Sequence, residues 1–378
     1  MIPFNKVSIT KVESDYVNEC LESRRICGDC KYTKLVSDWF EVNLKTKVLL
    51  TTSCTHALEM AAQLAGIQPG DEIIVPSYTF VSTVNAFALR GGIPVFIDID
   101  PKTMNLDVNL IEEKITSKTK AIFPVHYAGI ACDMDKIMEL AKKYNLIVIE
   151  DAAQAVGSYY KGKLLGTIGD YGCYSFHETK NYSMGEGGAL ITREETKYLE
   201  AEIIREKGTN RSQFIKGMVD KYTWHAIGSS YLPSDILAAV LYGQLQRYQE
   251  IMEKRLKIWN AYHKLLEKYE ALGKLNRPYV PEYSTNNAHM YYVILPSMKE
   301  RDELISLFKN SSITAPFHYI PLHTSPMGSK YGYKKGDLPL TEEYSERLIR
   351  LPLFVDMNDD EMNEICKVLT RKFEGDIL

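Results

Sequence analysis

The chain has 378 residues, of which 45% are hydrophobic and 25% charged, and its formal net charge is −4. This profile is typical of an ordinary globular protein, and the weak negative charge without a long basic run argues against broad nucleic-acid binding. No apolar stretch approaches the roughly 18 residues of a membrane helix, and the N-terminus lacks the apolar core of a signal peptide. We therefore expect a cytoplasmic protein without a nucleic-acid or membrane partner.

The seven cysteines are scattered along the chain, and their odd number argues against a disulfide framework. Cys27 and Cys30 have the spacing of redox and zinc-binding pairs, but no second pair completes a zinc site. Gly28 and Asp29 between them indicate a turn. A loop that carries two thiols without a role is the favoured interpretation, and we expect no metal site.

Short apolar runs alternate with helical patterns over the first half of the chain. A helix is predicted at residues 14–24, strands at 48–52, 72–76, 94–98, 121–126, 146–149, 172–176 and 188–192, and further helices at 55–65, 80–89, 110–115 and 134–144. Short strands separated by helices predict a parallel, doubly wound α/β sheet. The strands show little alternation, which indicates that both faces of the sheet are covered.

The pattern changes after about residue 235. Residues 235–269 have helical spacing, and a strand at 289–295 and helices at 299–309, 342–350 and 359–372 are predicted beyond them. We expect a large α/β domain over residues 1–248 and a smaller C-terminal domain over 249–378, joined by the long helix.

Lys180 lies 29 residues after Asp151, which follows the apolar run 146–149. Ligands of open α/β sheets bind beyond the carboxyl ends of the strands, where Asp151 is expected. Taken alone, Asp151 is better explained as a helix N-cap. Paired with Lys180, it suits pyridoxal phosphate, which needs a lysine for the Schiff base and an acid to keep the pyridine nitrogen protonated.

Other polar and aromatic groups are candidates for the same site. Hydroxyl groups at residues 51–55 precede a predicted helix and could bind a phosphate, although Ser53 could equally be only a helix cap. Ser175 is a second phosphate candidate. An aromatic ring in residues 76–80 could stack on the pyridine ring or pack in the core. Residues 205–222 are predicted to be a long loop, whose five positive side chains could neutralise a diphosphate or simply face solvent.

The chain resembles the DegT/DnrJ/StrS family of sugar-nucleotide aminotransferases over essentially its whole length. The resemblance rests on Thr-Ser-Cys-Thr at 52–55, Pro-Ser-Tyr-Thr-Phe at 76–80, Glu-Asp-Ala-Ala-Gln at 150–154, Ser-Phe-His-Glu-Thr-Lys-Asn at 175–181, Gly-Glu-Gly-Gly at 185–188 and Phe-His-Tyr at 317–319. It implies fold type I, with a mostly parallel central sheet and a small C-terminal α+β domain. It also implies pyridoxal phosphate as cofactor and a homodimer with active sites at the interface.

The resemblance also implies roles for individual residues. Lys180 would carry the cofactor and then move the proton, and Asp151 would pair with the pyridinium nitrogen. The other cofactor contacts implied are Ser53, Cys54, Thr55, Phe80, Gln154, Ser175 and His177. Residues expected to contact the substrate are Arg211, Lys221, Tyr222, His318 and Tyr319. Ser230 stands where relatives have an asparagine that reaches the partner's phosphate.

Within the family, residues 206–214, 220–224 and 228–232 resemble enzymes that move an amino group from L-glutamate to C-4 of TDP-4-oxo-6-deoxy-D-glucose. The expected product is TDP-4-amino-4,6-dideoxy-D-galactose, a precursor in common-antigen or O-antigen synthesis. The D-glucose epimer, a C-3 aminotransferase and a non-catalytic regulator on this fold are the open alternatives. A related 3-dehydratase would have histidine at Lys180, and a Rossmann oxidoreductase would need a glycine motif after Val48 that is absent.

Overall fold

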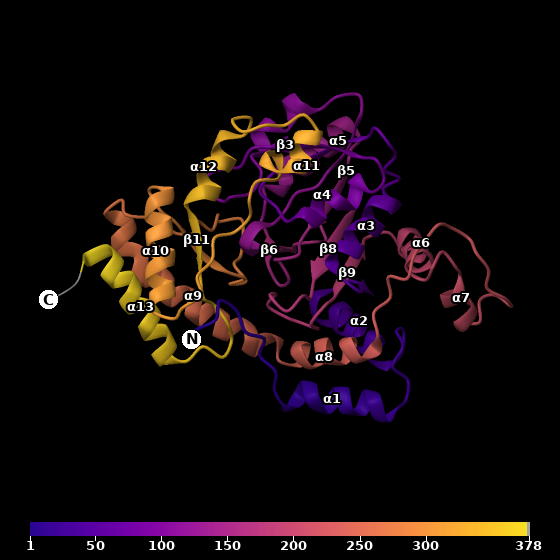
Figure 1. The fold of residues 1–378 in the computed structure, drawn as a ribbon. Coiled ribbons are helices and arrows are strands. Elements are labelled where there is room, and N and C mark those ends of the chain that lie inside the picture. Colours follow the sequence, from indigo (N-terminus) through magenta and orange to yellow (C-terminus); the bar gives the residue numbers. More distant parts are fainter. Residues whose placement is uncertain (376–378) are drawn as a thin grey trace.

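The computed structural model describes residues 1–375, and a seven-stranded sheet forms the centre of its larger part (Figure 1). The strand order is β1-β9-β8-β5-β4-β2-β3. The strands are β1 (Val48–Thr51), β2 (Glu72–Pro76), β3 (Ile93–Ile97), β4 (Thr119–Ile122), β5 (Ile147–Asp151), β8 (Tyr171–Ser175) and β9 (Gly188–Thr192). Pairing is parallel from β8 to β3, which confirms the expected mostly parallel α/β sheet.

Strand β9 departs from a fully parallel sheet, because it runs antiparallel to both β1 and β8. It follows β8 after a connection that contains no helix. Antiparallel neighbours can be joined by a loop, whereas parallel neighbours need a long crossover. The loop between these two strands carries Lys180, so the reversal of direction holds the lysine near the ends of both strands.

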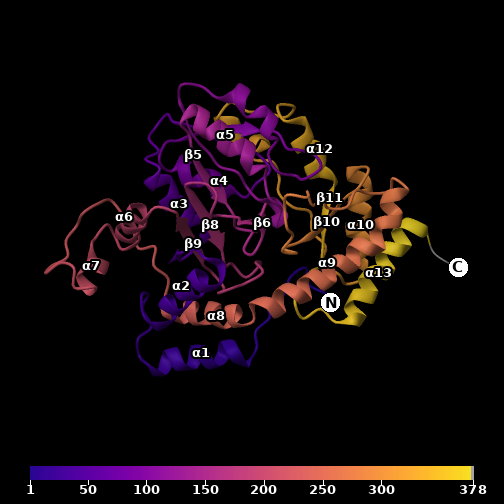
Figure 2. The same ribbon diagram turned by 180° about the vertical axis from the view of Figure 1, so that it is seen from behind.

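Helices cover both faces of the sheet (Figure 2). Neighbouring residues of β1 point into different cores: Leu50 packs with residues of α2, α5 and α8, and Leu49 with residues of α3, α4 and α6. The helices of this part are α1 (Lys11–Glu22), α2 (Lys31–Leu44), α3 (Cys54–Leu64), α4 (Val81–Ala88), α5 (Met134–Tyr144), α6 (Glu195–Arg205) and α8 (Asp235–Gln246). The expectation that both faces are buried is confirmed.

Four predicted elements differ from the structure. Residues 110–115 form no α-helix but parts of two 3-10 turns, η1 (Val108–Leu110) and η2 (Glu112–Lys114), since so short a segment seldom sustains an α-helix. Residues 235–269 are two helices, because α9 (Tyr248–Ala271) starts only after a break at Arg247. The predicted loop 205–222 contains a short helix, α7 (Arg211–Ile215). Helices α2 and α6 were not predicted.

The fourth difference lies in the C-terminal part. Helix α12 (Pro339–Arg347) stops at Arg347, and the residues predicted to continue it form strand β11 (Leu348–Leu351). Leu348 is buried in one cluster and Ile349 in another, and a strand allows this because successive side chains face opposite ways. β11 pairs antiparallel with β10 (Tyr291–Ile294).

A separate hydrophobic cluster holds the C-terminal part together, with Tyr262, Leu304 and Leu369 fully buried in it. The remaining elements there are α10 (Met298–Asn310), η4 (Leu322–Thr324), α11 (Pro326–Lys330) and α13 (Asp359–Glu374). The larger part also contains η3 (Tyr127–Gly129) and a hairpin formed by β6 (Tyr159–Tyr160) and β7 (Lys163–Leu164). The division at 248/249 stays a prediction; it falls at the start of α9. No helix among residues 1–375 is long and apolar enough to cross a membrane.

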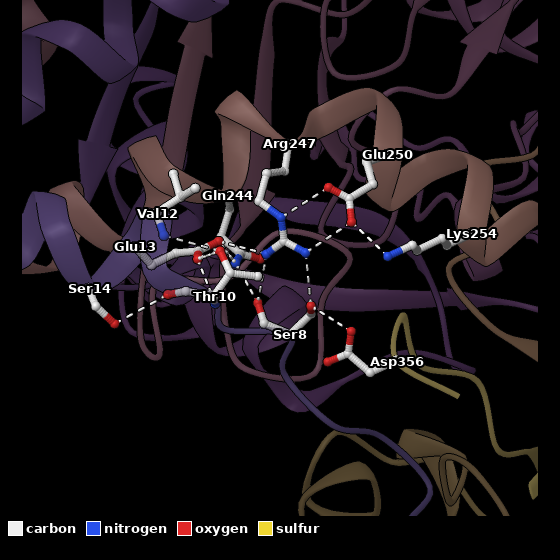
Figure 3. Close-up of polar contacts among 10 residues, drawn as sticks. All are labelled: Ser8, Thr10, Val12, Glu13, Ser14, Gln244, Arg247, Glu250, Lys254 and Asp356. Atoms are coloured by element: carbon white, nitrogen blue, oxygen red, sulfur yellow. Dashed lines mark hydrogen bonds and ion pairs between the residues drawn. The ribbon is translucent and has the colours of Figure 1, made fainter. Parts of the chain in front are cut away.

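A buried polar network surrounds the break between α8 and α9 (Figure 3). The Arg247 guanidinium donates from Nη1 to Glu13 Oε1 at 2.9 Å and from Nη2 to Ser8 Oγ at 3.1 Å. Gln244 Nε2 donates to the same Glu13 oxygen at 2.7 Å, and Ser8 Oγ donates to Asp356 Oδ1 at 2.9 Å. The network therefore ties α1, the α8–α9 junction and the C-terminal part to one another.

Replacing Arg247 by Met is expected to lower the free energy of unfolding by about 3–5 kcal/mol, because Glu13 would remain buried without its cationic partner. Denaturation in urea measures the loss. The matched control is the double variant Glu13→Gln/Arg247→Met, which buries no unpaired charge and should lose less than the single variant. Equal losses in the two variants would contradict the account.

The acid dependence of stability gives an independent measurement on Glu13. Burial alone would raise the pKa of Glu13, but hydrogen bonds from Thr10 and Arg247 outweigh it and lower the pKa. A carboxyl with a lowered folded pKa stabilises the protein above its unfolded pKa of about 4.3 and loses that contribution as pH falls further. The stability difference between wild type and Glu13→Gln should therefore shrink between pH 7 and about pH 3.5. A constant difference would exclude this linkage.

Candidate active site

A cavity of about 710 Å³ lies at the carboxyl ends of the parallel strands and reaches the C-terminal part. It brings together residues that are far apart in the sequence. The predicted site residues that line it are Ser53, Cys54, Thr55, Phe80, Asp151, Gln154, Ser175, His177, Lys180, His318 and Tyr319.

Asp151 is the last residue of β5, and a turn follows it, so it caps no helix. Its carboxylate is buried and held by two donors: Thr83 Oγ1 at 2.7 Å from Oδ2, and the Ala153 N–H at 3.1 Å from Oδ1. Burial raises the pKa of Asp151, while the bonds from Thr83 and Ala153 and the charge of Lys180 oppose this rise. The carboxylate is thus fixed in orientation beside a positive charge.

Lys180 lies in the loop after β8, where its N–H donates to the His177 carbonyl at 2.9 Å. Burial lowers the pKa of the Lys180 amine, against the opposing effects of Cys54 and Asp151. A lowered pKa increases the fraction of neutral amine, which is the form that can act as nucleophile or base. His177 steadies the loop, because its Nδ1 accepts from the Thr179 N–H at 3.2 Å.

The N-terminus of α3 lies at the edge of the cavity and has the groups that suit an anion. Ser53 is the N-cap and its Oγ accepts from the His56 N–H at 3.1 Å, so Ser53 both caps the helix and lines the cavity. The N–H groups of the first helical turn have no partners within a helix, and its dipole favours an anion. The hydroxyl groups of Thr55 and Ser82 are 2.7 Å apart beside them.

Gly188 allows this helix end to approach the sheet. A Cβ at position 188 would lie 2.4 Å from the backbone nitrogen of Cys54, a distance that no side chain tolerates. Gly188 pairs with Ser175 at the end of β8, so Ser175 also lies near the N-terminus of α3. The glycine-rich stretch at 185–188 therefore has a steric role beside the anion site.

Aromatic and imidazole groups form another part of the cavity lining. The Tyr127 hydroxyl lies 2.6 Å from His318 Nδ1, and the His318 ring stacks on that of Tyr319 with centroids 3.6 Å apart. Gln154 Nε2 donates to the Tyr319 hydroxyl at 3.1 Å. Burial lowers the pKa of His318 well below its ordinary value, which keeps this imidazole neutral. Phe80 presents a ring that is 56% exposed.

These residues fit pyridoxal phosphate. An anion site can hold its phosphate, a buried carboxylate can hold its protonated ring nitrogen, and the exposed ring of Phe80 can stack on it. Lys180 supplies the amine, and burial lowers the pKa of that amine. Each partner required by the cofactor is therefore present in one cavity.

Thr83, His289 and Arg350 were not identified from the sequence: His289 and Arg350 line the cavity, and Thr83 bonds Asp151. Thr83 lies in the first turn of α4, and its hydroxyl is 2.8 Å from that of Thr79, just before the helix; this pair of threonines was an available signal. His289 follows a local run of polar residues, 285–287, which gives no periodic pattern. Arg350 is a lone charge in the apolar run 348–351, and such an interruption was the clearest overlooked signal.

Some predicted site residues lie elsewhere. His126, the last residue of the predicted strand 121–126, also lies outside the cavity; it is fully buried and its Nε2 lies 2.9 Å from Glu150 Oε2. Arg211, Lys221 and Tyr222 do not line the cavity. They belong to the segment between α6 and α8, here called the arm, which carries α7 and extends away from the sheet (Figure 1). Ser230 is exposed at the base of this arm.

Comparison with known proteins agrees with this geometry. The model of the DegT/DnrJ/EryC1/StrS aminotransferase family matches residues 7–370. GDP-perosamine synthase of Escherichia coli O157:H7 is 36% identical, with 97% of both chains covered. The pleiotropic regulatory protein of Geobacillus stearothermophilus is also 36% identical, covering 83% of this chain and 81% of the relative.

Among solved structures, the sugar aminotransferase Spr1654 of Streptococcus pneumoniae in its PMP form superposes with a TM-score of 0.91 at 28% identity, covering 99% of each chain. Its PLP form superposes with a TM-score of 0.90. The family match spans nearly the whole chain, and the cavity contains each partner that the cofactor requires. The chain therefore belongs to the DegT/DnrJ/EryC1/StrS family and is a sugar aminotransferase that depends on pyridoxal phosphate.

Proposed function

We propose that the protein transfers the amino group of L-glutamate to C-4 of TDP-4-oxo-6-deoxy-D-glucose and forms TDP-4-amino-4,6-dideoxy-D-galactose. The observation that carries amino transfer is the placement of the partly buried Lys180 and the buried Asp151 in one cavity. The choice of sugar is supported by the resemblance of residues 206–214, 220–224 and 228–232. A role in a cell-surface glycan such as common antigen or O-antigen follows from that product.

The roles of the cavity residues follow from their chemistry. Bound pyridoxal phosphate supplies an electron sink for the carbon that gains or loses a proton. The Lys180 amine, whose pKa is lowered by burial, would hold the cofactor through its nucleophilic nitrogen and would move the proton as a base. Asp151, oriented by Thr83, would keep a proton on the ring nitrogen. The N-terminus of α3 would hold the phosphate.

A GDP-linked 4-oxo sugar is the second candidate substrate. It is favoured by the relative named GDP-perosamine synthase, which is 36% identical over nearly the whole chain. The two candidates are both 4-oxo sugars carried on a nucleotide, but they differ in the nucleotide and in the sugar ring. An experiment therefore has to compare the two nucleotide sugars.

We also propose that the enzyme is a homodimer whose arm reaches the active site of its partner. Several apolar side chains of the arm are exposed in the single chain: Phe214, Ile215, Met218, Trp224 and Ile227. Exposed apolar groups gathered on one segment are typical of an interface. Arg211 and Lys221 lie outside the cavity of their own chain, so their predicted contact with the diphosphate requires a second copy.

Lys180→Ala is expected to abolish turnover, with a loss of several orders of magnitude, because it removes both the nucleophile and the proton carrier. The measurement is single-turnover transfer from glutamate, with thermal unfolding as the control for folding. Near-native activity would refute the assignment of Lys180. A wild-type protein that binds no pyridoxal phosphate would instead support a regulatory role.

Incubation with glutamate and either TDP- or GDP-4-oxo-6-deoxy sugar identifies the substrate, with the product assigned by NMR. We expect the TDP sugar to react faster and to give an axial amine at C-4. An equatorial amine would assign the D-glucose epimer, and a C-3 amine would reject the proposed position. Preference for the GDP sugar would select the second candidate.

Mixing two inactive variants tests the shared active site. A Lys180→Ala subunit and an Arg211→Ala/Lys221→Ala subunit would form hybrid dimers with one intact site. Random reassortment should restore about a quarter of wild-type activity. No recovery would contradict the shared active site, and a monomer in sedimentation experiments would contradict the proposed dimer.

A further inference from the structure

Arg350 is the one charged residue of strand β11, and its side chain lines the cavity that contains Lys180. The strand fixes its backbone, because the Arg350 N–H donates to the Pro316 carbonyl at 2.9 Å. Leu351, on the opposite side of the strand, is fully buried. The C-terminal part of the chain therefore extends a guanidinium group toward the site built on the large sheet.

The guanidinium of Arg350 has no carboxylate partner among residues 1–375. Nη2 donates to the Phe317 carbonyl at 3.0 Å, and the group lies 4.4 Å from the ring centroid of Phe4. Nε is buried and has no hydrogen-bond partner. By contrast, Arg347 in the same segment pairs with Glu343, and Arg301 pairs with Asp302 at 2.6 Å.

A partly buried cation with an unused donor indicates an anionic ligand. Leaving a buried donor without a partner costs free energy, and a planar guanidinium with several free N–H groups matches a carboxylate or phosphate in a bidentate geometry. Phe4 holds the plane of the group from one side through a cation–π contact. The N-terminal segment is itself fixed there, since the Leu353 N–H donates to the Phe4 carbonyl at 3.2 Å.

The position of Arg350 selects the kind of anion. Its charge is close enough to Lys180 to contribute to the lowering of the lysine pKa. In an amino acid, the α-carboxylate is attached to the same carbon as the reacting amine. In a nucleotide sugar, the sugar ring separates the diphosphate from C-4. An anion beside the reacting atom is therefore the carboxylate of the amino donor.

We propose that Arg350 binds the α-carboxylate of the amino donor and so orients its amine toward the reacting centre. The inference rests on the proposed transfer from an amino acid and adds the residue that recognises the donor. It also predicts that the two half-reactions depend on Arg350 differently, because only the donor carries this carboxylate.

The test compares the holoenzyme of wild type, Arg350→Gln, Arg350→Lys and the control Arg347→Gln. The donor half-reaction is followed by the cofactor absorbance on adding glutamate, and the acceptor half-reaction by adding oxo sugar to the aminated enzyme. We expect Arg350→Gln to weaken apparent glutamate binding about 10- to 100-fold, as for loss of a charged hydrogen bond, with a small effect on the acceptor step. Arg350→Lys should recover part of the loss, and Arg347→Gln should resemble wild type.

Changing the ligand identifies the carboxylate. Isoglutamine, in which the α-carboxylate is an amide, should bind wild type and Arg350→Gln equally poorly. Glutamine, which keeps the α-carboxylate, should still bind wild type more tightly than Arg350→Gln. Calorimetric titration with glutarate, which carries carboxylates but no amine, measures binding without turnover and should show the same loss in Arg350→Gln.

Distinct outcomes separate the inference from the proposed function. If wild type reacts with glutamate and Arg350→Gln reacts equally well, only the role of Arg350 is wrong. If Arg350→Gln impairs the acceptor half-reaction instead, the anion is the nucleotide phosphate and the inference is overturned. If wild type shows no half-reaction with any amino acid, the proposed amino transfer itself fails.

Discussion

The placement of two opposite charges, the buried Asp151 and the partly buried Lys180, at one edge of the sheet is the constraint on which the rest of the site depends. Neither charge is stable in such a place without compensation. Asp151 receives hydrogen bonds from Thr83 and Ala153. Each of the two charges also favours the charged form of the other, because Lys180 lowers the pKa of Asp151 and Asp151 raises the pKa of Lys180. This arrangement requires β5 to end and the β8–β9 loop to turn at the same edge, which the antiparallel direction of β9 provides.

Much of the larger part of the chain could be predicted from the sequence because its strands are short apolar runs with both faces buried. The end of β5 at Asp151 and the helix start after Ser53 followed from local patterns, and each carries a site residue. The break within residues 235–269 was missed because contacts distant in sequence accompany it. The break at Arg247 accompanies its bonds to Glu13 and Ser8, and no local propensity records those.

The same distinction applies to the site. Its cofactor side comes from loops at strand ends, which a sequence pattern can indicate. Thr83 and Arg350 acquire their importance only through partners far along the chain. The basic residues of the arm show the converse: charge alone suggested a diphosphate site, yet the arm carries them away from the cavity of their own chain. The diphosphate contact of these residues stays a prediction, and composition could not give their location.

The geometry divides recognition between the two parts of the chain. The large sheet supplies the groups suited to the cofactor, whereas the C-terminal part supplies Arg350 through β11. The network of Glu13, Arg247 and Ser8 also joins the two parts, because Ser8 donates to Asp356 beyond β11. The proposed recognition of the donor by Arg350 would depend on such a junction, because a small displacement of a positioning group is costly to catalysis.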